Sequence, residues 1–260
     1  MIALFLRHGM EKRGLTASTL NDVAASVISD LFRYDNVSPT LDPLVRATKK
    51  VIGRLAKKGK GGKLPLPRRL LEDFVAMVDP RSLKDVRDVF LFIMMFGGML
   101  RGSEAAALKT ERVWVEDGNL YIFVEKSKSD QDSHGATIVL AGCPTSHLCP
   151  VSWFELYSKE RPQGAFLLHN TKKPGKKLSA KRPNALLKEW LGKAGVPKKD
   201  RASFGSHILR KGGATAAATE KVRMHVLKRH GRWKSDAVYL YIVDSQVEQL
   251  SVSRAVLGFD

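Results

Sequence analysis

Apolar residues in the first sixty positions recur at helical spacing. This periodicity predicts two amphipathic helices, at about 16–33 and 42–57, with Pro43 in the first turn of the second. Residues 57–63 read Lys-Lys-Gly-Lys-Gly-Gly-Lys and end the pattern, because the glycines oppose helix formation and the lysines favour water. We therefore expect one small helical domain at 1–62, including a basic linker, and a second domain at 63–260.

The second domain opens with helical patterns. Pro67 begins a predicted helix that runs to about residue 78, and Ser82 to Phe96 forms a strongly apolar one. From Arg112 to Leu140 the residues are rich in Val, Ile and Leu, and Asp117-Gly118-Asn119 is a good hairpin turn. A three-stranded antiparallel sheet is expected here, with 126–135 as its second connection.

The rest of the chain returns to helical spacing. Helices are predicted near residues 150–160, 180–194, 205–219, 222–230 and 235–242, and a short one from about 245. The expected fold class is mainly α with a small antiparallel β-sheet (α+β).

Composition adds a partner class to this picture. The chain has 260 residues, with 44 Lys+Arg against 26 Asp+Glu, a net charge of +18. Such an excess favours a polyanionic partner such as nucleic acid, although an anionic membrane surface or a ribosome would also satisfy it. The apolar runs Val89 to Leu100 and Ile2 to Leu6 are too short for a membrane span and a signal peptide, respectively. An intracellular protein without a membrane partner is expected.

The two cysteines do not predict a metal site. Cys143 and Cys149 lie near His134 and His147 but lack the paired spacing of zinc ligands. We interpret them as reduced thiols around a loop, with Pro150 in the first turn of the helix that follows.

The segment His207-Ile208-Leu209-Arg210 carries the most informative chemistry. Residues three apart share a helix face, so His207 and Arg210 can offer an imidazole and a guanidinium to one anion. Arginine suits phosphate because its planar donors grip two oxygens. The small residues from Gly212 to Ala218 let another backbone approach closely, as a helix buried beneath an active site requires.

Four segments in order resemble the boxes of the tyrosine recombinases, or phage-type integrases. The pattern H-x-L-R-x-x-x-A-T at 207–215 resembles the second arginine box, and Gly97 to Leu108, containing Arg101, resembles the first. Lys128 stands where the family places its hairpin lysine, and residues 231–237 precede a pair of tyrosines as the family's last box precedes its nucleophile. The resemblance covers about 64–250. It implies a recombinase catalytic domain preceded by a short, partial helical core-binding (SAM-like) domain.

The resemblance implies DNA strand cleavage and rejoining through a covalent 3′-phosphotyrosyl intermediate. Because bond energy is retained in that intermediate, no cofactor, metal or ATP is expected. Arg101 and Arg210 are the expected clamp on the phosphate, and Glu104 can orient Arg101 through a helical ion pair. His207 is expected to hydrogen-bond the phosphate or to assist proton transfer.

Lys128 and Lys126 are alternative general acids for the leaving 5′-oxygen. They lie two residues apart and would point to the same face of an extended strand, and Ser127-Lys128-Ser129 better resembles the family pattern.

Trp233 and His230 compete for the last-box position, where most bacterial members carry a Gly-His pair. We favour Trp233, because some recombinases have tryptophan there and His230 precedes the glycine. An indole N–H can donate to a phosphate oxygen but cannot shuttle a proton.

Tyr241 and Tyr239 compete as nucleophile. Tyr241 lies nine residues after Arg232, close to the family's usual interval. Tyr239 is too near and is expected to face the opposite way, into the core.

The implied partner is double-stranded DNA, which the family binds as a tetramer on two duplexes. The candidate DNA-binding residues are Lys57, Lys58, Lys60, Lys63 and Lys211. The protein is expected in the nucleus if eukaryotic, and in the cytoplasm or nucleoid if bacterial or phage.

Other functions share these features. A domesticated or truncated relative would bind DNA without cutting it, and the short first domain favours that alternative. A type IB topoisomerase is disfavoured, because such enzymes generally have lysine in place of His207. Only charge favours an RNA-binding protein.

Overall fold

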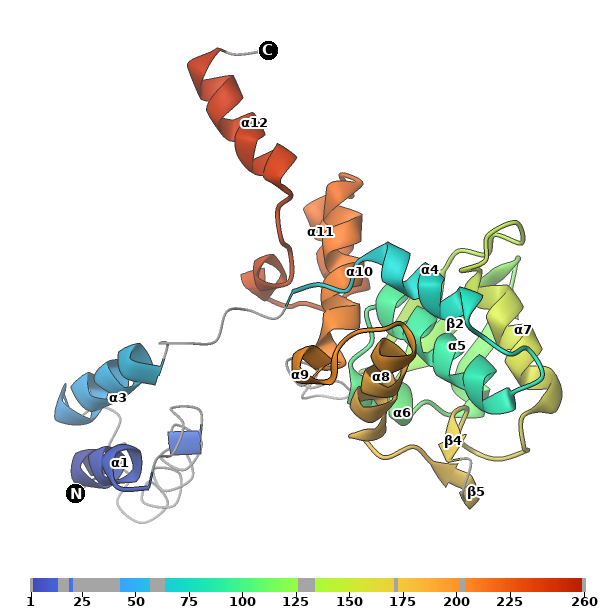
Figure 1. The fold of residues 1–260 in the computed structure, drawn as a ribbon, viewed down its shortest axis with the longest axis horizontal. Helices are drawn as coiled ribbons and strands as arrows, with labels where there is room; N and C mark the ends of the chain where they lie inside the picture. Colours follow the sequence, from blue (N-terminus) through green and yellow to red (C-terminus); the bar gives the residue numbers. More distant parts are fainter. Residues whose placement is uncertain are drawn as a thin grey trace. The chain divides into compact units, whose positions relative to one another are not determined.

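The computed structural model describes residues 2–13, 19–20, 43–56, 64–125, 134–170, 173–201 and 204–258. The chain divides into two compact units, Met1–Gly62 and Lys63–Asp260 (Figure 1). The predicted helix at 16–33 and the lysines of 57–63 fall almost entirely outside the described residues, as do Lys126 and Lys128.

The described part of the first unit is helical. Helix α1 (Ile2–Glu11) contacts α3 (Pro43–Ala56), and Leu6, Leu20 and Val45 are buried there. Helix α3 follows the predicted 42–57 closely, whereas α1 was not predicted.

Helix α5 (Leu83–Gly97) lies at the centre of the second unit, and every residue from Val86 to Phe96 is buried. Ser82 caps it by accepting a hydrogen bond from the Asp85 N–H at 3.2 Å. Helices α4 (Arg68–Ala76), α7 (Pro150–Glu160), α8 (Arg182–Lys193) and α10 (His207–Thr219) surround α5 (Figure 1). The predicted strongly apolar helix is therefore the core of the unit.

A three-stranded antiparallel sheet lies beside α7. Its strands, in the order β1-β2-β3, are β1 (Val113–Glu116), β2 (Asn119–Val124) and β3 (Ala136–Leu140). Asp117 and Gly118 both have positive φ, as a two-residue primed turn requires. Along β2 the buried residues alternate, so one face packs on the core. This confirms the predicted sheet and hairpin.

Short elements complete the second unit. They are α6 (Gly102–Ala106), the 3₁₀ turns η2 (Thr110–Arg112) and η3 (Asp236–Leu240), α9 (Lys198–Arg201), α11 (Met224–His230), α12 (Gln246–Leu257), and the hairpin β4 (His169–Asn170) with β5 (Lys173–Lys177). The mainly helical fold class is confirmed. The hairpin, α6 and α9 were not predicted. No helix within the described ranges is long and apolar enough to cross a membrane.

Close approach of α10 to α5 depends on glycine. A Cβ at Gly213 would lie 2.0 Å from the Phe96 carbonyl oxygen, and one at Gly212 would lie 2.2 Å from the Leu66 carbonyl oxygen. Neither backbone could stay in place beside a larger residue. The predicted role of the small-residue run is confirmed.

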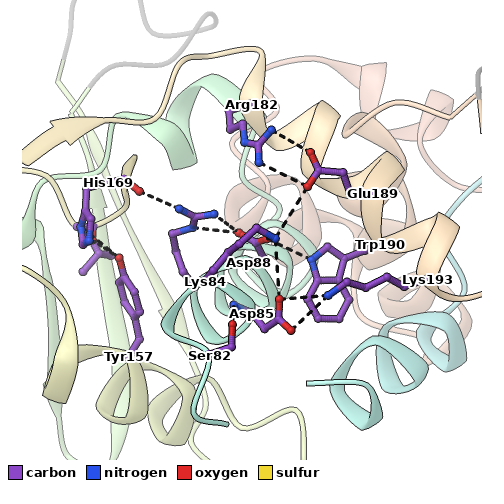
Figure 2. Close-up of polar contacts among 12 residues, drawn as sticks. Ser82, Lys84, Asp85, Asp88, Tyr157, His169, Arg182, Glu189, Trp190 and Lys193 are labelled. Carbon is purple, nitrogen blue, oxygen red and sulfur yellow. Dashed lines mark hydrogen bonds and ion pairs between the residues drawn. The ribbon is translucent and has the colours of Figure 1, made fainter. Parts of the chain in front are cut away.

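A buried polar network anchors α5 to the elements around it (Figure 2). Asp88 on α5, fully buried, accepts from Arg87 Nη2 at 2.5 Å and from the Trp190 indole on α8 at 3.2 Å. Arg87 also donates to the His169 carbonyl oxygen at 3.0 Å, and the His169 ring lies 3.3 Å from the Tyr157 hydroxyl. Polar groups this deep are tolerated because they satisfy one another, so the network fixes α7, α8 and β4 around α5.

Candidate active site

The connection from α5 to α6 forms one wall of the candidate site. Met99 has φ +48, a left-handed conformation that L residues with side chains rarely adopt. Its carbonyl oxygen accepts hydrogen bonds from Arg210 Nη1 and, at 3.2 Å, from Arg232 Nη2. Side chains that are 111 and 133 residues away in sequence therefore meet at one backbone oxygen.

Glu104 links the first arginine box to the last box. Its carboxylate accepts from the Arg101 backbone N–H at 2.8 Å, from Arg101 Nη1 at 2.6 Å and from Arg232 Nη2 at 2.8 Å. Its side chain is only 3% exposed. Burial alone would raise the pKa of Glu104, but Arg232 and Arg101 together hold it below its usual value. The carboxylate is therefore ionised at neutral pH.

Arg210 is fully buried at the base of the site. It donates to the Met99 carbonyl oxygen and, at 2.6 Å, to the Gly231 carbonyl oxygen, and its Nε has no hydrogen-bond partner among the described residues. Burial, reinforced by Arg101 and Arg232, lowers the pKa of Arg210 to about 10, so it keeps its charge at pH 7. Its carbonyl partners carry no countercharge.

Aromatic rings cover the Arg210 guanidinium. Its Cζ lies 4.3 Å from the centroid of the Trp233 ring and 5.5 Å from that of Tyr241, and the two ring centroids are 5.1 Å apart. Stacking on rings stabilises a desolvated cation. A Cβ at Gly231 would lie 1.7 Å from the Trp233 ring, so the ring needs glycine at that position.

Thr215 ties the segment that carries Tyr241 to α10. Its hydroxyl donates to the Tyr241 carbonyl oxygen at 3.0 Å and accepts from the Val243 N–H at 3.3 Å. The tyrosine is half-buried against Trp233. Because Thr215 lies on the same helix as Arg210, its bonds fix the backbone of Tyr241 relative to Arg210. The structure thus brings together Arg101, Glu104, Arg210, Trp233 and Tyr241.

Tyr239 does not enter the core, so its predicted orientation was wrong. It is 57% exposed, whereas Val238 is fully buried. The reason is the 3₁₀ geometry of η3, in which residues three apart eclipse one another, so Tyr241 follows Val238 on the packed side.

The remaining candidates lie around this cluster. His207 is exposed in the first turn of α10, one turn before Arg210, and Lys211 follows Arg210 half-buried. Trp233 is 8% exposed, and its Nε1 has no partner among the described residues. A ring nitrogen of His230 lies 2.8 Å from the Gly97 carbonyl oxygen. Within the described ranges, no group of three or more His, Cys, Asp or Glu side chains could hold a metal ion.

Arg232 and Thr215 were not among the predicted site residues. Both lie inside segments that the sequence had singled out, and Arg232 begins the nine-residue interval to Tyr241. Arg232 has φ +59, and its side chain is only 8% exposed. The signal available in the sequence was the arginine of the last box, a third arginine beside Arg101 and Arg210, in a segment that was interpreted through its tryptophan.

The fold and this arrangement define a catalytic domain of the tyrosine-recombinase type. Residues 68–243 match the model of the Phage integrase family, and the chain belongs to that family.

Individual relatives agree with that assignment. The integrase/recombinase xerD homolog of Selenomonas ruminantium is 28% identical over 241 residues, which cover 90% of this chain and 68% of that protein. The post-cleavage complex of XerH site-specific recombinase with palindromic difH substrate superposes with a TM-score of 0.64 at 16% identity, covering 98% of this chain and 70% of that one. A lambda integrase (75–356) dimer bound to a COC′ core site gives a TM-score of 0.59 at 19% identity, covering 94% and 79%. The two structures show a shared fold.

Proposed function

We propose that this protein carries out site-specific DNA recombination by cleaving and rejoining strands, with Tyr241 as the nucleophile. One observation carries the proposal. The Tyr241 ring lies beside a buried arginine whose charge is not neutralised by its own hydrogen-bond acceptors. Within the described residues, the guanidiniums of Arg101, Arg210 and Arg232 gather around the single carboxylate of Glu104. Such a surplus of positive charge favours a phosphate diester as ligand.

The proposed first step is an in-line displacement at phosphorus. The Tyr241 hydroxyl gives up its proton, for which His207 or a water is the proposed acceptor, as its oxygen forms a bond to the scissile phosphorus. The bond from phosphorus to the 5′-oxygen breaks, and that oxygen takes up a proton. Lys128 is the proposed proton donor, with Lys126 as the alternative, and both lie outside the described residues. In the second step, a 5′-hydroxyl attacks the phosphotyrosine and releases the tyrosine. The phosphodiester bond count is conserved, so the reaction needs no external energy source.

Arg101 and Arg210 are proposed to neutralise the charge that develops on the non-bridging oxygens. Preorganised donors in a buried site stabilise such charge more strongly than water does. Two buried donors, Nε of Arg210 and Nε1 of Trp233, have no acceptor within the described residues, and anionic oxygens are groups that satisfy such donors. His207, exposed at the start of α10, is proposed to contact the same phosphate from the open side.

Double-stranded DNA is the proposed partner. The net charge of +18 supports it, and the lysines at 57, 58, 60, 63 and 211 are proposed to contact its backbone. The first unit is proposed to serve as a partial core-binding domain. The protein is proposed to act inside the cell, where its DNA substrate is.

A tetramer on two duplexes is the proposed active assembly. Helix α12, described over its whole length, has no buried residue, and Val247, Val252 and Val256 on it are 65% or more exposed. Apolar side chains left uncovered on a helix within one chain are typical of a surface that a second copy covers. We propose that this segment packs on a neighbouring protomer when DNA is bound.

The test is adduct formation on a nicked duplex taken from DNA that flanks the gene. A nick near the cleavage site lets the short strand diffuse away and traps the covalent complex, which migrates slowly in a denaturing gel. We expect such a band, together with DNA affinity that falls steeply with salt. Tight, salt-sensitive binding to that DNA without a covalent band would instead identify a DNA-binding relative that does not cut.

A further inference from the structure

Arg232 is the residue whose contacts reach most parts of the site. Its Nη1 lies 3.3 Å from the carbonyl oxygens of Gly98 and His230, and its Nη2 lies 3.2 Å from that of Met99. Nη2 also lies 2.8 Å from Glu104 Oε2. One guanidinium therefore bonds to the α5–α6 connection, to Glu104 in α6 and to the last residue of α11.

The backbone of Arg232 is adapted to this role. Its φ of +59 is a conformation that costs free energy for any residue with a side chain, so surrounding contacts must hold it. The side chain is 8% exposed, and both terminal nitrogens are engaged by protein acceptors. A guanidinium so occupied is suited to holding other groups in place.

The group it holds is Glu104. The carboxylate bonds to Arg232 through Oε2 and to the Arg101 guanidinium through Oε1 at 2.6 Å. Without Arg232, the carboxylate would lose its second cationic partner, and Arg101 alone would determine its position. Because Glu104 is nearly fully buried, little water can replace the lost partner.

We propose that Arg232 is a positioning residue, which orients the Arg101 guanidinium through Glu104 and holds the Met99 carbonyl oxygen for Arg210. The kinetic part of this inference rests on the proposed strand-cleaving function, whereas the orientation of Arg101 does not. Lysine at this position would keep one bond to Glu104 but lose the fork that bonds to three carbonyls, so Arg232→Lys should restore only part of the effect of Arg232→Ala.

The first measurement is the side-chain NMR spectrum of Arg101, assigned by its loss in Arg101→Lys. A guanidinium held by a buried carboxylate rotates slowly and gives resolved Nη signals. In Arg232→Ala we expect these signals to broaden or merge, and in Arg232→Lys to change less. Arg229→Ala is the matched control, because Arg229 is an exposed arginine in the last turn of α11, three residues before Arg232. Unchanged Arg101 signals in Arg232→Ala would overturn the proposal.

The second measurement is the single-turnover rate of covalent adduct formation at saturating DNA. We expect a loss of about 100-fold in Arg232→Ala, the scale for one displaced transition-state donor, with DNA affinity changed less than about threefold. Equal losses of rate and affinity, or equal rates, would overturn the role. If Arg232→Ala alters the Arg101 signals but the wild-type protein forms no adduct, the orientation of Arg101 by Arg232 is retained and the cleavage function is rejected.

Discussion

Arg210 and Arg232 donate hydrogen bonds to the same backbone oxygen, the carbonyl of Met99. The left-handed conformation of Met99 turns that carbonyl toward both guanidiniums. Two like charges converge on one acceptor, and Glu104 supplies the nearby negative charge that makes this tolerable. The cluster is therefore built from contacts among three boxes that are distant in sequence, and removing any member should affect the others.

Replacing Arg210 by lysine should impair cleavage more than folding. A single ammonium cannot bond both the Met99 and Gly231 carbonyls, and an unpaired buried carbonyl costs about 1–3 kcal/mol of stability. Loss of the planar fork should lower the single-turnover cleavage rate by about 10²–10³. Urea unfolding and adduct kinetics measure the two effects. Arg229→Lys, at an exposed site, is the control. An Arg210→Lys protein that cleaves at the wild-type rate would contradict the proposed role of Arg210 at the phosphate.

Glu104→Gln should destabilise the second unit. The substitution removes the carboxylate from two arginines that are mostly buried, and breaking a buried ion pair typically costs about 3–5 kcal/mol. Glu111→Gln is the matched control because that side chain is 68% exposed, and its effect should stay within about 0.5 kcal/mol. Chemical unfolding measures both. Equal effects of the two substitutions would show that the Glu104 pairs contribute no more than a surface contact.

Gly213→Ala should loosen the contact between α10 and α5. The new methyl group would lie 2.0 Å from the Phe96 carbonyl oxygen, and overpacking of this kind costs about 1–3 kcal/mol. Thermal unfolding measures the change. In the control Gly164→Ala, the added Cβ would lie 3.7 Å from its nearest neighbour, an ordinary contact distance. A Gly213→Ala protein as stable as wild type would mean that the helices separate without cost.

His169 should make stability fall in mild acid. Burial, with Arg87 and Arg161, lowers the pKa of His169 below the usual 6.5, so the unfolded chain binds the proton first as pH falls. Stability at this site is therefore complete above about pH 6.5 and is lost below it, until the folded state also protonates. We expect His169→Gln to reduce the slope of unfolding free energy against pH between about 6.5 and 5. His147→Gln, at an exposed histidine, is the matched control.

Local patterns in the sequence were enough to predict α5, the sheet and the β1–β2 turn. Helix α5 is an apolar run with a serine cap, and Asp117-Gly118 specifies its turn through backbone preference alone. The short elements α6 and β4–β5 carry too few residues for periodicity to register. Arg101, Arg210 and Tyr241 were predicted from the resemblance of their segments to the boxes of the tyrosine recombinases. The bond of Arg232 to Glu104 joins residues 128 apart, and no local rule indicates it.

Tyr239 illustrates a different limit. The prediction placed Tyr239 and Tyr241, two residues apart, on opposite sides of one segment, with Tyr239 facing the core. The 3₁₀ turn η3 instead places Val238 and Tyr241 on the packed side. The spacing to the preceding box favoured Tyr241 for another reason, so the preferred nucleophile did not depend on the mistaken orientation.

Identification of the tyrosine that becomes attached to DNA tests the central claim most directly. The trapped adduct is digested with protease and nuclease, and the nucleotide-bearing peptide is sequenced by mass spectrometry, in parallel with Tyr241→Phe and Tyr239→Phe proteins. We predict modification of Tyr241, loss of the adduct in Tyr241→Phe and its retention in Tyr239→Phe. A nucleotide on Tyr239, or an adduct that survives in Tyr241→Phe, would contradict the assignment of Tyr241 beside Arg210 as the nucleophile.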